Sequence, residues 1–507
     1  MSYRFVITQR GRASCLLLFL LLLQQRALAQ KEATYWFFGD KGGWDFSAGA
    51  PRPITGSAMT TTFPSVVISD GQTGELLFYS NGEQVWNRQH QVMPHGEGLP
   101  TFRDVFQGAL TLPVPGQPQQ YYLFTLGLAL PPPERETNLF YSRIDMGLAG
   151  GLGDVVETEK NRHLPGTFTE QLTAIRHANG RDYWVLVHEW PGAYFQVFLV
   201  DPAGVRLAQR VAVGPELRRT DFFRALSGFL RASPDGRHLA YSTPSLEIPL
   251  SLFDFDPATG NISHFISLGQ LFDGGGVAFS PDNTKLYAQD YRFFNRERRE
   301  RNVVVQYDLQ AGDDAAIAAS GQSVVAGNPA TNINSREQSV SGFYAWQLGL
   351  DGRLYGASGY EDATTSVIGD KLYVIPYPNR RGYACGIRYQ TVDFRPGSLG
   401  PGLPNFLQHY FNGLEAPPEP ESPCEQAEVS IFPNPTTESF RVQVGDGCAA
   451  PYRLAIYDAL GRRILVRSMT ETAQDKQVNI AFLAAGVYWV EVQVGSASRS
   501  CHKLLKY

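Results

Sequence analysis

Short runs of apolar residues, many of them aromatic, recur along most of this chain and are separated by tight-turn residues. In the commonest arrangement a turn rich in Gly, Asn or Asp precedes such a run. These residues tolerate the positive φ of a tight turn, and the flanking runs have the composition of strands, so each arrangement predicts a β-hairpin. The turns and the runs after them are Asp70-Gly71 before 76–79, Gly116 before 121–124, Asn179-Gly180 before 183–186, Ser233–Gly236 before 239–241, Ser280–Asn283 before 286–287 and Asp351-Gly352 before 354–355.

A second kind of strand-like run alternates apolar and polar residues and ends at a polar residue or a proline. The end positions are Asp45, Asn87, Asp145, Asp201, Asp256, Asp308 and, more loosely, Pro378, with successive spacings of 42, 58, 56, 55, 52 and 70 residues. A repeat of about 54 residues is longer than a WD repeat but suits a four-stranded blade with loop insertions. We therefore predict an all-β fold with a seven-bladed β-propeller over residues 33–412. Six or eight blades are alternatives to seven, and a β-sandwich is the alternative fold.

The two ends of this region predict how the ring closes. The run 35–38 resembles the second strand of a hairpin without a first strand, and 402–411 resembles a first strand without a second. Pairing the two would build one blade from both ends of the region and would remove an exposed sheet edge. We therefore expect Trp36 and Phe406 to share one sheet.

Composition agrees with a turn-rich globular protein. The chain has 50 glycines and 33 prolines, 43% hydrophobic residues and only 18% charged residues. Such a chain can bury large cores, which excludes disorder, collagen and coiled coil. The net charge of −5 argues against a nucleic-acid partner, because no basic excess is present to neutralise phosphates.

Residues 1–29 have the organisation of an export signal. Arginines precede an apolar run at 16–23, and Ala27 and Ala29 form a small-x-small cleavage site before Gln30. The apolar run is too short to cross a bilayer, which needs about 20 residues. No later stretch reaches that length, so we predict an exported protein without a transmembrane segment.

Export into an oxidising compartment makes the cysteines after the signal candidates for disulfide bonds. We prefer Cys448 with Cys501, because both lie in the last short domain, and this choice leaves Cys385 to pair with Cys424. Four free thiols are the alternative. No pair has the spacing of a zinc or redox site.

Several short motifs within 33–412 resemble the secreted propeller proteins of Bacteroidetes. These motifs lie at 35–39, 44–46, 77–82, 85–87, 93–94, 176–180 and 402–406. The resemblance implies a secreted or cell-surface propeller, and it implies no established activity.

The C-terminal part of the chain is predicted to be a separate module. The Pro- and Glu-rich residues 413–427 predict an extended linker, and 428–507 contain the short strands of a small antiparallel β-sandwich. This module resembles the type A C-terminal sorting domain of the type IX (Por) secretion system. The matching residues are Pro433, Asn434, Pro435, Tyr457, Asp458, Gly461, Gly486, Tyr488 and Lys503.

That resemblance implies a partner, a location and a fate for the module. It implies that the module engages the type IX secretion machinery and guides passage across the outer membrane. It also implies that the module is then removed, while the cargo is attached to surface lipopolysaccharide or released. The protein is therefore expected to be extracellular or attached to the cell surface.

The sequence offers no convincing catalytic, metal or cofactor motif. His188-Glu189 begins like a zinc-protease helix, but no second histidine follows at the required spacing. From loop position alone, His188, Trp190, Tyr360 and Glu361 are candidates for a ligand-binding rim. We therefore predict a non-catalytic binding or adhesion module for a glycan or protein. A secreted carbohydrate-active hydrolase or lyase and a structural component of adhesion or gliding machinery are the alternatives.

Overall fold

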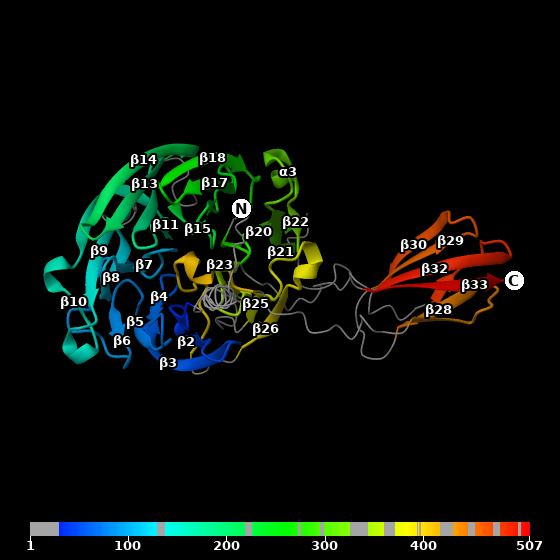
Figure 1. The fold of residues 1–507 in the computed structure, drawn as a ribbon, viewed down its shortest axis with the longest axis horizontal. Coiled ribbons are helices and arrows are strands. Elements are labelled where there is room, and N and C mark those ends of the chain that lie inside the picture. Colours follow the sequence, from blue (N-terminus) through cyan, green and yellow to red (C-terminus); the bar gives the residue numbers. More distant parts are fainter. Residues whose placement is uncertain are drawn as a thin grey trace, which may run out of the picture. The chain divides into compact units, whose positions relative to one another are not determined.

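The computed structural model of the protein contains two compact units (Figure 1). The larger unit holds strands β1 to β26, and the smaller unit holds β27 to β33. The predicted export signal and nearly all of the predicted linker lie outside the described residues. The structure describes residues 30–128, 137–218, 226–271, 275–294, 299–324, 343–358, 371–392, 394, 397–415, 429–444, 452–469, 477–494 and 498–507.

The larger unit is built from successive antiparallel sheets. Two sheets have three strands, and their members are β1 (Tyr35–Phe38), β2 (Asp40–Asp45) and β3 (Arg52–Thr60), followed by β4 (Val66–Ser69), β5 (Leu76–Ser80) and β6 (Val85–Asn87). Three sheets have four strands each. The first contains β15 (Phe229–Ala232), β16 (His238–Ser242), β17 (Ser251–Asp256) and β18 (Asn261–Ser267), and the second contains β19 (Val277–Phe279), β20 (Lys285–Phe294), β21 (Arg299–Asp308) and β22 (Gln322–Ser323). The third contains β23 (Phe343–Leu348), β24 (Leu354–Ser358), β25 (Lys371–Ile375) and β26 (Arg388–Thr391).

One further sheet has eight strands and contains two antiparallel meanders, joined where β9 pairs with β11. Its members are β7 (Ala109–Val114), β8 (Gln117–Leu128), β9 (Thr137–Asp145), β10 (Asp154–Val155), β11 (Arg162–Arg176), β12 (Tyr183–Glu189), β13 (Gly192–Asp201) and β14 (Gly204–Leu217). Because this sheet can be divided in more than one way, the predicted number of seven blades stays a prediction. The helices that the structure describes in the larger unit are short, namely η1 (Ala149–Gly151), η2 (Glu157–Glu159), α3 (Asp314–Ala319), η4 (Gly382–Cys385) and η5 (Gln408–Phe411).

The sheets follow one another around a ring, as in a β-propeller (Figure 1). The first strands of successive meanders contact each other in chain order, from β1 through β4, β7, β11, β15 and β19 to β23. The last sheet contacts the first through aromatic side chains: Tyr355 of β24 lies 5.8 Å from Trp36 and 5.9 Å from Trp44 between ring centroids. The predicted all-β propeller fold is confirmed.

Six turns rich in Gly, Asn or Asp were predicted to form hairpins. In the structure, each of them joins the first and second strands of a meander. Gly116, Gly180, Gly236 and Gly352 have φ values of 80°, 74°, 71° and 73°, and Asn283 has 63°. This left-handed conformation is open to glycine and tolerated by asparagine, which explains the residue types at these turns.

The recurring polar residues at strand ends have a common structural role. In each case a side-chain oxygen accepts a hydrogen bond from the backbone N–H two residues later, which starts the next turn. These bonds run from Ser47 to Asp45, Gln89 to Asn87, Gly147 to Asp145, Ala203 to Asp201, Ala258 to Asp256 and Gln310 to Asp308. The loosely matching Pro378 has no such bond to offer, and β25 already ends at Ile375.

The predicted closing strand is wrong. Residues 402–407 form no strand, and 408–411 form the 3-10 helix η5. β1 contacts β4 directly and is itself the first strand of its sheet, so that sheet has no place for another first strand inside it. Trp36 and Phe406 do meet, with ring centroids 5.8 Å apart, but as packed side chains rather than ladder partners. The backbone links between the two end regions include a bridge between Asp40 and Ser398, with N···O distances of 3.0 and 2.9 Å, and a hydrogen bond from Asn405 N to Ser65 O at 2.8 Å.

A histidine connects the sheet of β15 to β18 with helix α3 on the surface of the larger unit. His264 of β18 lies 2.8 Å from Asp254 Oδ2 through Nδ1, and 2.9 Å from Asp314 Oδ2 of α3 through Nε2. His238 stands on the other side of Asp254 at 3.2 Å. Hydrogen bonds to Asp254 and Asp314 raise the pKa of His264 above its ordinary value of 6.5.

This arrangement predicts a pH-dependent contribution to stability. Because the folded-state pKa is raised, the contribution is fully present below pH 6.5 and is lost as pH rises through the folded pKa. The three groups are substantially exposed, so the effect should stay below about 1 kcal/mol. We expect His264→Asn to lower the melting temperature at pH 5.5 and to have less effect at pH 9, as measured by calorimetry. An equal effect at both pH values would contradict the assignment.

The smaller unit is a two-sheet antiparallel sandwich. One sheet has β27 (Val429–Phe432), β28 (Ser439–Val444) and β31 (Gln477–Asn479), and the other has β30 (Arg463–Met469), β29 (Tyr452–Tyr457), β32 (Gly486–Val494) and β33 (Ser498–Lys506). Their inward residues form a separate core that includes Phe440, Leu454, Val490 and Leu504. Within the described residues of both units, no helix has the length and apolar character needed to cross a membrane.

Candidate functional site

An irregular segment, residues 402–407, packs against the first strands of the larger unit and forms what we call the axial segment. Its Asn405 is only 6% exposed. Asn405 Nδ2 donates to the carbonyl oxygens of Ala109 in β7 and Leu172 in β11, both at 3.1 Å. Asn405 Oδ1 accepts from Arg231 Nη1 of β15 at 3.3 Å. A single side chain therefore connects three first strands at the axis of the propeller.

Arg231 is a buried cation whose hydrogen bonds go to neutral oxygens. Besides Asn405, it donates to Gln347 Oε1 and to the Trp346 carbonyl oxygen, both at 3.2 Å. Burial lowers the pKa of its guanidinium group to about 10, so the group is still charged at neutral pH. A buried charge is costly unless polar groups surround it. The axial segment supplies part of that surrounding.

A cavity of about 520 Å³ lies beside η5, where the axial segment ends; we call it the axis-end cavity. The turns β11–β12 and β15–β16 form two of its walls, and residues 408–415 form a third. Polar side chains converge on it from several elements. They belong to Gln30, Arg176, His177, Ser233, Asp235, Arg237, Gln408, His409, Asn412 and Glu415.

Two residues that line the axis-end cavity each have a side-chain atom that is closed to solvent and has no hydrogen-bond partner among the described residues. The atoms are His409 Nδ1 and the Tyr410 hydroxyl oxygen. Burial lowers the pKa of His409 to about 3, so its imidazole is neutral at physiological pH. Buried polar atoms normally have a protein, water or ligand partner.

The structure does not support the predicted ligand rim. His188 lies within β12, is 2% exposed, and packs against Phe195 and Tyr241. Burial lowers its pKa to about 4. Trp190 is also 2% exposed and belongs to the same core. Both were assigned to a loop, but the long β11–β14 meander buries them. Tyr360 and Glu361 lie outside the described residues.

Within the described residues, no three or more His, Cys, Asp and Glu side chains are placed to hold a metal ion. Cys385 and Cys501 are free thiols, the first buried and the second exposed. Their predicted partners, Cys424 and Cys448, lie outside the described residues. Cys385 packs inside the propeller core, where burial raises the pKa of its thiol.

In the smaller unit, Asn434 connects the loop after β27 to the last strand. Its Nδ2 donates to the Lys503 carbonyl oxygen at 2.6 Å, and its Oδ1 accepts from the Leu505 N–H at 2.9 Å. The next bonds come from the backbone, with Thr436 N donating to Leu505 O at 2.9 Å and Tyr507 N to Thr436 O at 3.0 Å. The amide side chain thus imitates a backbone unit, and the loop pairs with the outer edge of β33.

The other predicted motif residues lie on the four-stranded sheet. Asp458 caps the β29–β30 turn, where its Oδ1 accepts from Leu460 N and Arg462 N, both at 2.9 Å. Gly461 gives this turn its positive φ of 78°. Gly486 begins β32 opposite Lys506 of β33. Tyr457 faces β32 at Trp489, and the neighbouring Tyr488 donates its hydroxyl hydrogen to Ala484 O at 2.8 Å.

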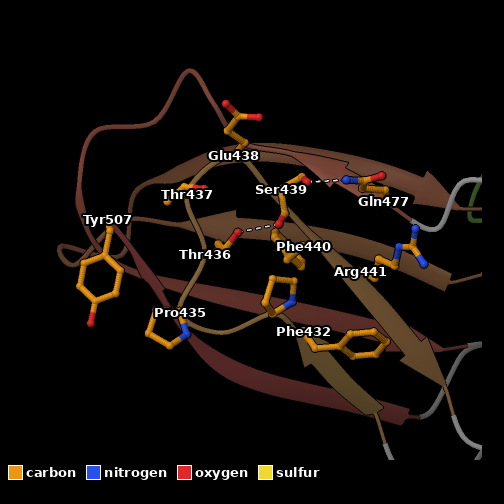
Figure 2. Close-up of a pocket in the computed structure, with 11 residues that line it drawn as sticks. Phe432, Pro435, Thr436, Thr437, Glu438, Ser439, Phe440, Arg441, Gln477 and Tyr507 are labelled. Atoms are coloured by element: carbon orange, nitrogen blue, oxygen red, sulfur yellow. Dashed lines mark hydrogen bonds between the residues drawn. The ribbon is translucent and has the colours of Figure 1, made fainter.

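A cavity of about 720 Å³ lies beside the Asn434 loop. Figure 2 shows residues that line it. Pro433 and Pro435 of the motif line it, together with Phe432 and the C-terminal Tyr507. Phe432 is 43% exposed and Tyr507 75% exposed. Thr436 and Gln477 both bond to Ser439 and hold the floor of the cavity. The predicted motif residues Pro433, Asn434, Pro435 and Lys503 are thus brought together at one edge of the sandwich.

Most of the smaller unit matches the model of a known protein family. Residues 430–506 match the family described as "Secretion system C-terminal sorting domain". The chain carries a type IX sorting domain. This domain indicates secretion across the outer membrane to the cell surface or the extracellular space, and it implies a Bacteroidetes origin and an interaction with the secretion machinery.

Solved structures of other proteins match parts of this chain at low similarity. The propeller domain of Myceliophteria thermophila Cps50 (Swd1) is 12% identical, with a TM-score of 0.35 over 64% of this chain and 93% of that one. TolB from Acinetobacter baumannii is also 12% identical, with a TM-score of 0.29 over 73% of this chain and 74% of that one. These values carry no functional information. No curated protein matches the sequence significantly.

The polar residues at the propeller axis were missed by the sequence analysis. Arg231 interrupts the apolar run Phe229-Leu230-Arg231-Ala232, all of which is buried. A charged residue inside a short apolar strand is the available signal for such a site, because charged residues are rarely buried without a purpose. Nothing in the local sequence around Asn405 indicates that its partners lie in β7, β11 and β15.

Proposed function

We propose that this protein is an extracellular binding module. In this proposal the sorting domain delivers the propeller to the cell surface or medium, and the propeller binds a glycan or a protein without chemical turnover. The axis-end cavity is the proposed binding site. The observation that supports this most directly is the convergence of polar residues from several elements, among them Arg176, His177 and Asp235, on one cavity.

The cavity has the general properties of a ligand site. Its volume of about 520 Å³ falls within the ~300–1,000 Å³ that is usual for small-molecule sites. Its walls belong to strand ends and short turns of adjacent sheets, which a propeller scaffold holds in fixed positions. Arg176 and His177 line the cavity, are at least partly exposed, and supply hydrogen-bonding groups for a polar partner.

A cavity-filling substitution tests the proposal. Ala178 is exposed and lines the cavity, so Ala178→Trp should obstruct it without disturbing the core. We expect binding to glycan arrays or to immobilised surface proteins to weaken at least about tenfold, equivalent to ~1.4 kcal/mol. Ala203→Trp places the same side chain on the exposed β13–β14 turn and serves as the matched control.

Two results would contradict this function. One is saturable binding that Ala178→Trp and Ala203→Trp leave equally unchanged, which would place the site elsewhere. The other is cleavage of a bound glycan, measured as new reducing ends, which would favour a hydrolase or lyase.

A further inference from the structure

The chain contains three Asn-Gly pairs, at 81–82, 179–180 and 412–413. An asparagine before a glycine can lose its side-chain amide without an enzyme, because the backbone nitrogen of the glycine attacks the side-chain carbonyl carbon. The reaction requires that this nitrogen and the side chain are free to approach each other. All three pairs lie in described parts of the chain, so the structure shows how firmly each of them is held.

The first pair is buried, and hydrogen bonds hold both of its reacting groups. Asn81 is 5% exposed, and its Oδ1 accepts from Glu83 N at 3.0 Å and from Gln84 N at 2.9 Å. The attacking nitrogen of this pair, Gly82 N, donates to Ser80 Oγ at 2.9 Å. These bonds would have to break before the two groups could meet.

The second pair lies in the β11–β12 turn and is exposed, but it is held in the same way. Asn179 Oδ1 accepts from Arg181 N and Asp182 N, both at 3.0 Å. Its Nδ2 donates to Asp182 Oδ2 at 2.7 Å. The attacking nitrogen, Gly180 N, donates to the His177 carbonyl oxygen at 2.9 Å. Exposure alone therefore does not free this asparagine for the reaction.

The third pair follows η5 and is held much less firmly. Asn412 has φ −70° and ψ 129°, and Gly413 has φ 74°, which are close to the values of a type II turn over 411–414. The hydrogen bond that closes this turn, from Leu414 N to Phe411 O, is long at 3.4 Å. Neither the Asn412 side chain nor Gly413 N forms a hydrogen bond to another described residue.

Gly413 also leaves room for the movement that the attack requires. The peptide plane between Asn412 and Gly413 must rotate to bring the glycine nitrogen to Asn412 Cγ. A glycine can follow this rotation, because φ values of either sign are open to it. Apart from its chain neighbours, no described atom lies within 4 Å of the place that a Cβ on Gly413 would take, and both residues are exposed.

We infer that Asn412 is the preferred site of spontaneous deamidation in the folded protein. Gly413 N forms a bond to Asn412 Cγ, the Cγ–Nδ2 bond breaks, and ammonia leaves with the proton from Gly413 N. Water then opens the cyclic imide at either of its carbonyl groups, which gives aspartate or isoaspartate. Because Asn412 and Gly413 line the axis-end cavity, the product places a new carboxylate on the cavity wall. The cavity therefore becomes more acidic as the molecule ages, whatever its ligand.

Incubation of the full-length protein at mildly alkaline pH tests the inference. Peptide mapping by mass spectrometry gives the deamidated fraction at each of the three pairs over time. We expect Asn412 to react at least about tenfold faster than Asn81 and Asn179, a difference of ~1.4 kcal/mol in barrier. In urea the three rates should become similar, because the protecting hydrogen bonds are lost and a glycine follows each asparagine.

Two matched variants provide a second measurement, the release of ammonia from the folded protein. Asn412→Gln changes an exposed residue, and the longer side chain disfavours closure of the imide ring. This variant should lose most of the early ammonia release. Asn179→Gln makes the same change at the held and exposed pair, so it should release ammonia at the rate of the unmodified protein.

Three results would overturn the inference. The first is deamidation of Asn81 or Asn179 in the folded protein as fast as that of Asn412. The second is unchanged ammonia release from Asn412→Gln. The third is a preference for Asn412 that persists undiminished in urea, which would show that the local sequence, and not the fold, selects the site.

Discussion

Asn405→Ala should lower the free energy of unfolding of the propeller by about 3 kcal/mol, because each buried partner left unsatisfied costs ~1–3 kcal/mol. The substitution removes the donors to the Ala109 and Leu172 carbonyl oxygens and an acceptor for the Arg231 guanidinium. All of these groups are buried, so water does not readily replace the lost bonds. The expected result is an earlier unfolding transition of the propeller in urea.

Tryptophan fluorescence measures this transition well. Six of the seven tryptophans precede the sorting domain, and only Trp489 belongs to it. Asn412→Ala is the matched control, since Asn412 is the same residue type shortly after the axial segment and is exposed. Its unfolding midpoint should remain close to that of the unmodified protein. An Asn405→Ala midpoint that also remains there would show that the axial segment does not hold the first strands together.

Asn434→Ala should reduce export of the protein at least about tenfold. The substitution removes both side-chain bonds to β33, at Lys503 O and Leu505 N, and leaves the edge of that strand incompletely paired. Two such bonds are worth ~1–3 kcal/mol together, which is a large share of the stability of so small a domain. The measurement is an immunoblot of the medium, the cell surface and the periplasm. Protein that is not exported should accumulate in the periplasm.

Two further variants sharpen this experiment. Asn434→Asp keeps the acceptor for Leu505 N but loses the donor to Lys503 O, so it should also impair export. Gln443→Ala removes an exposed amide from the neighbouring β28 and should be exported normally. Normal export of both Asn434 variants would mean that the motif loop has no part in recognition or folding of the sorting domain.

Local rules account for the parts of the fold that the sequence predicts well. Asp201 and Asp256 each end a strand because their side chains accept a bond from the backbone two residues later, and this needs no distant partner. Gly352 and Asn283 mark turns because few other residues adopt their positive φ. The motif residues of the sorting domain were found for a similar reason, since their order along the chain is itself the signal.

The site could not be predicted in the same way. Residues 402–407 are mostly apolar and have the composition of a strand. Their position in the fold depends on the hydrogen bonds of Asn405, whose partners in β7 and β11 lie more than two hundred residues away in the sequence. His188 was expected at a rim from loop position alone, whereas its side chain packs against Phe195 and Tyr241 on other strands. Composition indicates whether a residue prefers burial; it does not indicate which strands meet around it.

The position of the axial segment has a consequence for the order of synthesis. Residues 397–411, which complete the propeller, are among the last to be synthesised before the sorting domain. A chain whose synthesis stops before these residues therefore lacks both the sorting domain and the segment that completes the propeller. Any chain that contains the sorting domain has therefore already synthesised all the residues of the propeller.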